Sequence, residues 1–149
     1  MGVLLDATKA FLKGEKWEFD EAKDRPILRM LFKGQNGRWV LYAHAREQLS
    51  QLVFYSVLSE TAPKERHAAI NELLCRINFN LGIGNFEMDH TDGNLRFRSS
   101  VDFEGGAPLP HLIKNLALTN VVTMDKYREV ILAVIQGTAP DKALGALKA

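Results

Sequence analysis

The sequence predicts an α+β fold, an antiparallel β-sheet with helices packed on it, in the element order α-β-β-β-β-α-β-β-α. The first observation behind this prediction is that the spacing of apolar residues changes along the chain from the helical period to the two-residue period of strands and back. The second is that two turn dipeptides, Asn36-Gly37 and Asp92-Gly93, each separate a pair of strand-like runs. At 149 residues the chain has the length of one ordinary domain, and we expect residues 1–149 to form a single α+β domain.

The chain begins with a short amphipathic helix that is followed by the first strand. Between Val3 and Lys13 the apolar residues fall on one side of a helix, and Gly14 follows as a stop signal. In the stretch KWEFDEA the period becomes two, so Trp17 and Phe19 face the same way and predict a strand.

The next two strands form a hairpin around Asn36-Gly37, because both residues of a type I′ turn have positive φ and this dipeptide favours that turn. A turn centred there pairs Phe32 with Leu41 on the face toward the core and Leu31 with Tyr42 on the other face. The remaining core-facing pairs are Met30 with Ala43 and Leu28 with Ala45. The remaining pairs of the other face are Lys33 with Val40, Arg29 with His44 and Ile27 with Arg46. That second face is therefore apolar in its middle and polar at its ends.

A further strand, LVFYSVLS from Leu52 to Ser59, is apolar on both faces, as strands covered on both sides tend to be. The three neighbouring strands leave part of an outer face apolar, which predicts that something covers it. The cover is either internal, from the first helix or the tail after Gly137, or external, from a client protein or a second copy. The residues expected to bind the partner are Leu31, Val40, Tyr42 and Tyr55.

The stretch TAPKERHAAINELLCRINFN returns to the helical period, and Gly82 follows it as a stop signal. A second hairpin centred on Asp92-Gly93 places Asp89 opposite Arg96 and Glu87 opposite Arg98. Opposite charges that face each other across strands stabilise a sheet by about 0.2 to 1 kcal/mol per pair. This hairpin is therefore predicted to be scaffold.

The same fragment, GIGNFEMDHTDGNLRFRSS, contains the residue types of a phosphate loop or a metal site, but not their order. A dinucleotide loop follows a strand and opens a helix, and here Glu87 stands where its third glycine belongs. A calcium loop fitted to Gly93 would begin at Met88 and end at Ser99, which are not its ligands. A transition-metal cluster fails because the two-residue period puts His90 on the opposite face from Glu87. We expect no metal and no cofactor.

The C-terminal part from Phe103 to Gly137 is helical, with a β-branched patch at residues 119–123. This patch leaves two alternatives, one kinked helix or two helices. The final stretch DKALGALKA predicts a short helical turn or a frayed tail.

The composition favours neither a nucleic-acid-binding protein nor a membrane protein, and no sequence motif favours an enzyme. The formal charge is +1 and no run of Lys and Arg exceeds two residues, whereas nucleic-acid-binding proteins usually carry a marked basic excess. No apolar run approaches the length of a membrane span, and the single cysteine, Cys75, predicts a cytoplasmic protein without disulfides. Cys75 is expected to be a buried or boundary thiol, and His44 and His111 solvated or capping residues. Since no Ser-His-Asp, CxxC or HExxH pattern exists, no catalytic residue is predicted.

The segment INELLCRINFNLGIGNFEMDHTDGNLRFRSSVDF resembles the YbjN-like bacterial proteins, most closely their cyanobacterial branch. The following LPHLIKNLALTNVVTMDKYREVILAVIQG is similar to the closing helices of that family, and the resemblance covers residues 15–137. It implies a type III secretion chaperone-like fold, a scaffold that binds protein segments and dimerises. Members of the family are described as sensory transduction regulators, and the resemblance supplies no catalytic residues.

Three functions follow as hypotheses. The first is a non-enzymatic protein-binding module, chaperone-like or regulatory, whose partner is another protein or a second copy in a homodimer. The second is a small-ligand sensor or an unrecognised enzyme with a pocket between sheet and helices. The third is purely structural self-association.

Overall fold

The computed structural model describes residues 2–147, and its elements follow the predicted order with one short helix added at the end. The helices are α1 (Val3–Gly14), α2 (His67–Asn78), α3 (Pro110–Ile135) and α4 (Pro140–Gly145). The strands are β1 (Asp20–Glu21), β2 (Ile27–Lys33), β3 (Arg38–Arg46), β4 (Gln51–Thr61), β5 (Asn85–Met88) and β6 (Asn94–Asp102). Two single-turn 3-10 helices, η1 (Glu47–Leu49) and η2 (Lys64–Arg66), precede β4 and α2.

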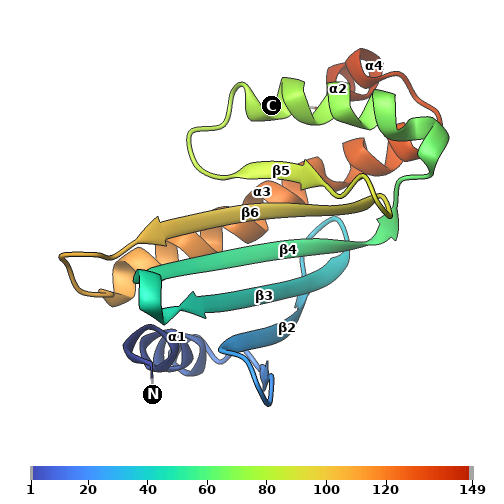
Figure 1. Ribbon diagram of the computed structural model, residues 1–149. Helices are drawn as coiled ribbons and strands as arrows, with labels where there is room; N and C mark the ends of the chain where they lie inside the picture. The colour runs from blue at the N-terminus through green and yellow to red at the C-terminus, as the bar shows by residue number, and fades with distance from the viewer. Residues whose placement is uncertain (1, 148–149) are drawn as a thin grey trace.

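The strands form one six-stranded antiparallel sheet in the order β1-β2-β3-β4-β6-β5. Side chains alternate between its faces, so that Leu41, Ala43 and Ala45 of β3 are buried while Tyr42 and His44 point the other way. In Figure 1 the long helix α3 runs behind β4 and β6, α2 and α4 lie beyond β5, and α1 lies at the β2–β3 end. The helices and the inner face of the sheet share one hydrophobic core.

Helix α1 belongs to the core layer. Its apolar side, including Leu4 and Leu12, is buried against the inner face and α3. The Glu47 carboxylate accepts the backbone N–H groups of Leu4 at 3.1 Å and Leu5 at 2.9 Å, which satisfies two donors that the first turn of a helix leaves free.

Helix α3 is continuous through the β-branched patch, which settles the choice between one helix and two. Val121 and Asn120 within the patch are fully or almost fully buried against the sheet. Because packing stabilises the helix more than the lower propensity of β-branched residues weakens it, the helix does not break.

The predicted register of the first hairpin is wrong by two residues. Leu31 lies opposite Val40 and Arg29 opposite Tyr42, and the Gly34 N–H donates to the Gly37 carbonyl. The turn is therefore centred one residue earlier than Asn36-Gly37, and of these two residues only Gly37 has a positive φ.

Helix α3 provides the physical reason for this register. The Asp125 carboxylate accepts the backbone N–H groups of Gln35 at 3.1 Å and Asn36 at 2.8 Å, and Arg128 donates to the Asn36 carbonyl at 2.9 Å. These contacts select a turn that local preference alone does not favour. A slip of two residues keeps every side chain on its predicted face.

The second hairpin is displaced in the same way. Glu87 lies opposite Arg96 instead of Arg98, and Asp89 lies in the turn instead of opposite Arg96. The Asp89 carboxylate accepts the Thr91 N–H at 2.8 Å, and these Thr91 hydrogen bonds lower the pKa of Asp89. The Gly93 carbonyl accepts the Ala62 N–H at 2.9 Å, so this turn is also held by a distant segment.

Three smaller predictions need correction. The first strand is only Asp20–Glu21, and Trp17 precedes it in a loop, where its ring packs edge-on against Phe11 and Phe32. Cys75 is exposed instead of buried or at a boundary, because it lies on the side of α2 away from the core. His44 lies opposite Ile27 instead of Arg29.

Candidate protein-binding surface

The outer face of the sheet is the side of β2, β3 and β4 that points away from α3, and no described helix packs on it. Its side chains are Ile27, Arg29, Leu31 and Lys33 of β2, Arg38, Val40, Tyr42, His44 and Arg46 of β3, and Gln51, Val53, Tyr55, Val57 and Ser59 of β4. Helix α1 packs on β3, η1 and α3, and α4 packs on α2 and α3. Within residues 2–147 neither candidate internal cover lies over this face, so the internal alternative is wrong for the described chain.

An apolar groove of about 430 Å³ lies on the outer face. Leu31, Val40, Tyr42 and Val57 contribute to its lining, and Leu31 is 78% exposed. The structure thus brings three of the four predicted partner-binding residues together. The sequence-based prediction did not include Val57 as a site residue. The available signal was that the run LVFYSVLS, in which Val57 lies, is apolar on both faces.

The fourth predicted residue, Tyr55, lies beside Tyr42 but outside the groove lining. The Arg96 guanidinium carbon stands 4.3 Å from the centre of the Tyr55 ring, a cation–π contact. One face of this ring is therefore already occupied by the protein itself.

His44 stands near one end of the outer face, between Ile27 of β2 and Val53 of β4. Its pKa is lowered from the ordinary value of 6.5, first by burial and then by the positive charges of Arg46 and Arg25. Arg46 and Arg25 therefore add positive potential at this end of the face, as a smaller cause of the lowered pKa than burial.

This shift predicts how stability depends on pH. Because the folded protein disfavours protonated His44, the unfolded chain takes up the proton first as the pH falls below 6.5, and the free energy of unfolding decreases from there down to the folded pKa. An NMR titration of the His44 ring should give a pKa below 6.5, and Arg46→Gln should raise it. Lys64→Gln on η2 should leave it unchanged. A pKa at or above 6.5 in the wild type would contradict the electrostatics described here.

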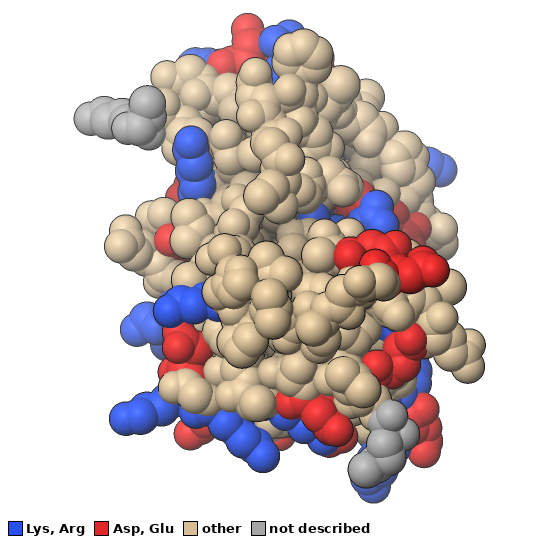
Figure 2. All heavy atoms as spheres, turned by 90° about the vertical axis from the view of Figure 1, so that its left-hand side faces the viewer, with Lys and Arg blue, Asp and Glu red and all other residues tan. Residues whose placement is uncertain are grey.

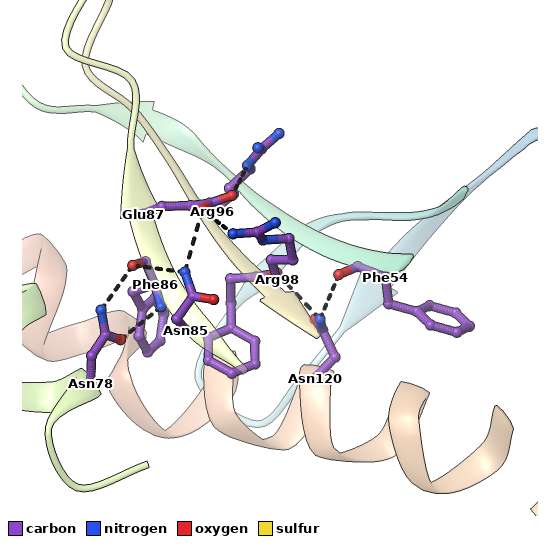
Figure 3. Close-up of polar contacts among 9 residues, drawn as sticks. Phe54, Asn78, Asn85, Phe86, Glu87, Arg96, Arg98 and Asn120 are labelled. Atoms are coloured by element: carbon purple, nitrogen blue, oxygen red, sulfur yellow. Dashed lines mark hydrogen bonds and ion pairs between the residues drawn. The ribbon is translucent and has the colours of Figure 1, made fainter. Parts of the chain in front are cut away.

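The β6–β5 side of the sheet carries a charge cluster instead of an apolar groove (Figure 3). Arg96 donates to one Glu87 carboxylate oxygen at 2.6 Å and Arg98 to the other at 3.1 Å. Among residues 2–147 no three metal-binding side chains come close enough together to hold an ion. The cluster holds the hairpin together, which is what the charge pattern predicts.

A double-mutant cycle on Glu87 and Arg98 should give a coupling of about 0.3 to 1 kcal/mol, because both side chains are partly exposed and solvent screens them. The same cycle on Glu72 and Arg76, an exposed pair within α2 at 2.8 Å, should give less. Urea unfolding of the single and double variants measures both couplings. Zero coupling together with a rise in melting temperature on adding Mg²⁺, Ca²⁺ or Zn²⁺ would show that the carboxylate serves an ion instead.

The chain matches the model of the YbjN family, described as "Putative bacterial sensory transduction regulator", over residues 5–132. It belongs to the YbjN family. Comparison with curated proteins finds no match.

Two solved structures share the fold of this YbjN family member. E. coli YbjN, described as "a putative transcription regulator", gives a TM-score of 0.62 at 12% identity, covering 84% of this chain and 89% of that one. A chain of the HopA1-SchA chaperone-effector complex gives 0.57 at 14% identity, covering 83% and 91%. These likenesses confirm the predicted α+β fold, which is similar to that of type III secretion chaperones.

Two further features of this YbjN family member concern the small-ligand hypothesis and membrane insertion. A groove of about 400 Å³ between the β2–β3 turn and α3 is lined by Phe32, Val121, Val122 and Asp125, but the Asp125 carboxylate already binds the turn. None of the described helices is both long and apolar enough to pass through a membrane.

A broad area without charged side chains lies at the end of the molecule that Figure 2 faces. There the charged atoms gather toward the lower part and the edges, and a broad area between them carries none. The connections α2–β5 and β6–α3 lie at this end (Figure 1) and carry the exposed side chains Phe79, Ile83 and Leu109. Phe79 is 87% exposed, which makes it a useful reference for the outer face.

Proposed function

We propose that this protein is a non-enzymatic protein-binding module, chaperone-like or regulatory, that acts in the cytoplasm as one α+β domain. Its binding surface is the outer face of the sheet, with Leu31, Val40, Tyr42 and Tyr55 at the contact. The observation that carries this proposal is the apolar groove that the chain's own helices leave uncovered. Burying a leucine or tyrosine there contributes about 1.5 to 3 kcal/mol, whichever partner supplies the cover.

The structural likenesses support this function. One of the similar folds comes from a chaperone–effector complex, and the other from a protein described as a regulator. A chaperone binds a segment of another protein, and an exposed apolar sheet face is a surface on which such a segment docks.

Tyr42→Glu tests the proposal, because it places a charge in the groove without touching the core. The variant should keep the circular dichroism spectrum of the wild type. When it is immobilised, it should fail to capture proteins that the immobilised wild type captures from lysate of the native organism. Mass spectrometry quantifies the captured proteins. Light scattering should show whether the wild type is a dimer that Tyr42→Glu converts to one chain.

Val122→Glu is the matched control, since Val122 is an exposed valine on α3 on the other side of the sheet. It should capture the same proteins as the wild type. If Tyr42→Glu captures them as well as the wild type does, the outer face is not the binding surface. The same conclusion follows if the wild type is a monomer and the Tyr42→Glu variant is unfolded.

A further inference from the structure

The outer face concentrates positive charge. Its basic side chains are Arg29, Lys33, Arg38 and Arg46, and none of its side chains is acidic. The four form no ion pair within the described residues, although Asp20 of β1 is the cross-strand neighbour of Arg29. Since the whole chain has a formal charge of only +1, this face is more positive than the protein as a whole.

Two of these cations stand at the groove itself. Lys33 and Arg38 lie directly opposite each other across β2 and β3, and both line the groove. Like charges directly opposite destabilise a strand pair. On β6, by contrast, Arg96 and Arg98 share the Glu87 carboxylate. The chain thus neutralises its cations on β6 and leaves those beside the apolar groove free.

We infer that the outer face binds a segment of a partner protein in which acidic residues alternate with large apolar ones. The apolar side chains of the segment enter the groove between Leu31, Val40 and Tyr42, and its carboxylates pair with Lys33 and Arg38 at the rim. This inference rests on the proposed function and names the chemistry of the partner.

Charge argues against a second copy as the occupant. In a two-fold dimer the same patch of both chains meets, so the unpaired cations of one outer face would face those of the other. No acidic side chain on the outer faces of β2, β3 and β4 is available to compensate them.

The groove also fits a peptide better than a single-stranded nucleic acid. Bases stack on open aromatic rings, and Arg96 already covers one face of the Tyr55 ring at 4.3 Å. The apolar side chains that line the groove are four aliphatic ones, Leu31, Val40, Val57 and Leu58, and three aromatic ones, Phe32, Trp39 and Tyr42. Trp39 is buried, and Phe32 and Tyr42 are half-buried, so these rings offer bases less surface for stacking than fully exposed rings would.

The test is a selection of phage-displayed random peptides of about 12 residues on the immobilised full-length protein, a length that spans the sheet face in extended form. The selected peptides should be enriched in Asp and Glu together with large apolar residues. Fluorescence anisotropy of the labelled peptides should show that Lys33→Glu with Arg38→Glu weakens binding by about tenfold or more, and that affinity falls as salt is raised. The pair Lys13→Glu with Lys64→Glu makes the same change of charge on α1 and η2 and should leave affinity within about twofold.

The other outcomes separate this inference from the proposed function. Neutral or basic peptides that bind the charge-reversed variant but not Tyr42→Glu would overturn the inference and leave the outer face as the binding surface. A selection with no peptide that depends on Tyr42 would count against both. A wild-type dimer that Tyr42→Glu dissociates, or binding of a labelled thymidine oligonucleotide that the charge reversal abolishes, would identify a second copy or a nucleic acid as the occupant and overturn the inference. Circular dichroism of each variant confirms that a loss of binding is not a loss of fold.

Discussion

Replacing Gly93 by alanine should lower the free energy of unfolding by about 3 kcal/mol or more, a large part of the stability of an ordinary domain. Gly93 has a φ of 76°, a conformation that costs a side chain about 1 kcal/mol or more. A Cβ at this position would in addition overlap the backbone of Ala62, whose N–H donates to the Gly93 carbonyl. Backbone cannot move aside as the end of a flexible side chain can, so the clash adds to the strain.

Gly105→Ala separates the two causes. Gly105 has nearly the same conformation, with a φ of 79°, but nothing lies within 4 Å of its added Cβ. We expect a loss of about 1 kcal/mol for this variant by urea unfolding. Equal losses for both variants would show that the contact with Ala62 does not matter.

Asn120→Ala should destabilise the protein by about 3 kcal/mol, because it removes the polar anchor between α3 and the sheet. The Asn120 amide donates to the Phe54 carbonyl at 3.0 Å, the Phe97 carbonyl at 3.2 Å and the Ser99 hydroxyl at 2.9 Å. Figure 3 shows its side chain reaching up from α3 to the strands. Its carbonyl oxygen accepts the Ser56 hydroxyl at 2.6 Å.

Asn120 is fully buried. The groups that lose their hydrogen-bond partner in Asn120→Ala therefore have no water to bind instead. Each buried polar group that loses its partner costs about 1 to 3 kcal/mol. Asn115→Ala is the control, because Asn115 lies on the exposed side of the same helix. Urea unfolding should place it within about 0.5 kcal/mol of the wild type. A small loss for Asn120→Ala would mean that apolar packing alone fixes α3.

The order of elements and the two faces of the sheet follow from periodicity, and both could be predicted. Burial repeats every second residue in a strand, so Leu28, Met30 and Leu41 could be assigned to the core without knowledge of the neighbours. The outer-face positions of Leu31 and Tyr42 follow by the same reasoning.

The registers could not be predicted, because contacts with distant segments select the turns. Asp125 lies 90 residues from Gln35 in sequence, and Ala62 binds Gly93 from the end of β4. A local preference for Asn36-Gly37 is too weak to compete with such contacts.

The error in register hid which cations of the candidate site lie opposite each other. With Lys33 placed opposite Val40, the outer face reads as an apolar centre with polar ends. In the observed register Lys33 lies opposite Arg38, and the like charges at the groove become visible. The apolar residues and the cations of the site were thus accessible from the sequence, and only the pairing of Lys33 with Arg38 depended on tertiary structure.

The most direct measurement of whether the outer face is the binding surface is hydroxyl-radical footprinting of the protein alone and in complex. The complex is formed with a partner recovered by Tyr42-dependent capture or with the tightest selected peptide. Oxidation of Leu31 and Tyr42 should fall by about threefold or more on binding, while that of Phe79, which is 87% exposed on the α2–β5 connection, should not change. Protection of Phe79 with Leu31 and Tyr42 unaffected would contradict the account and move the binding surface to the other end of the molecule.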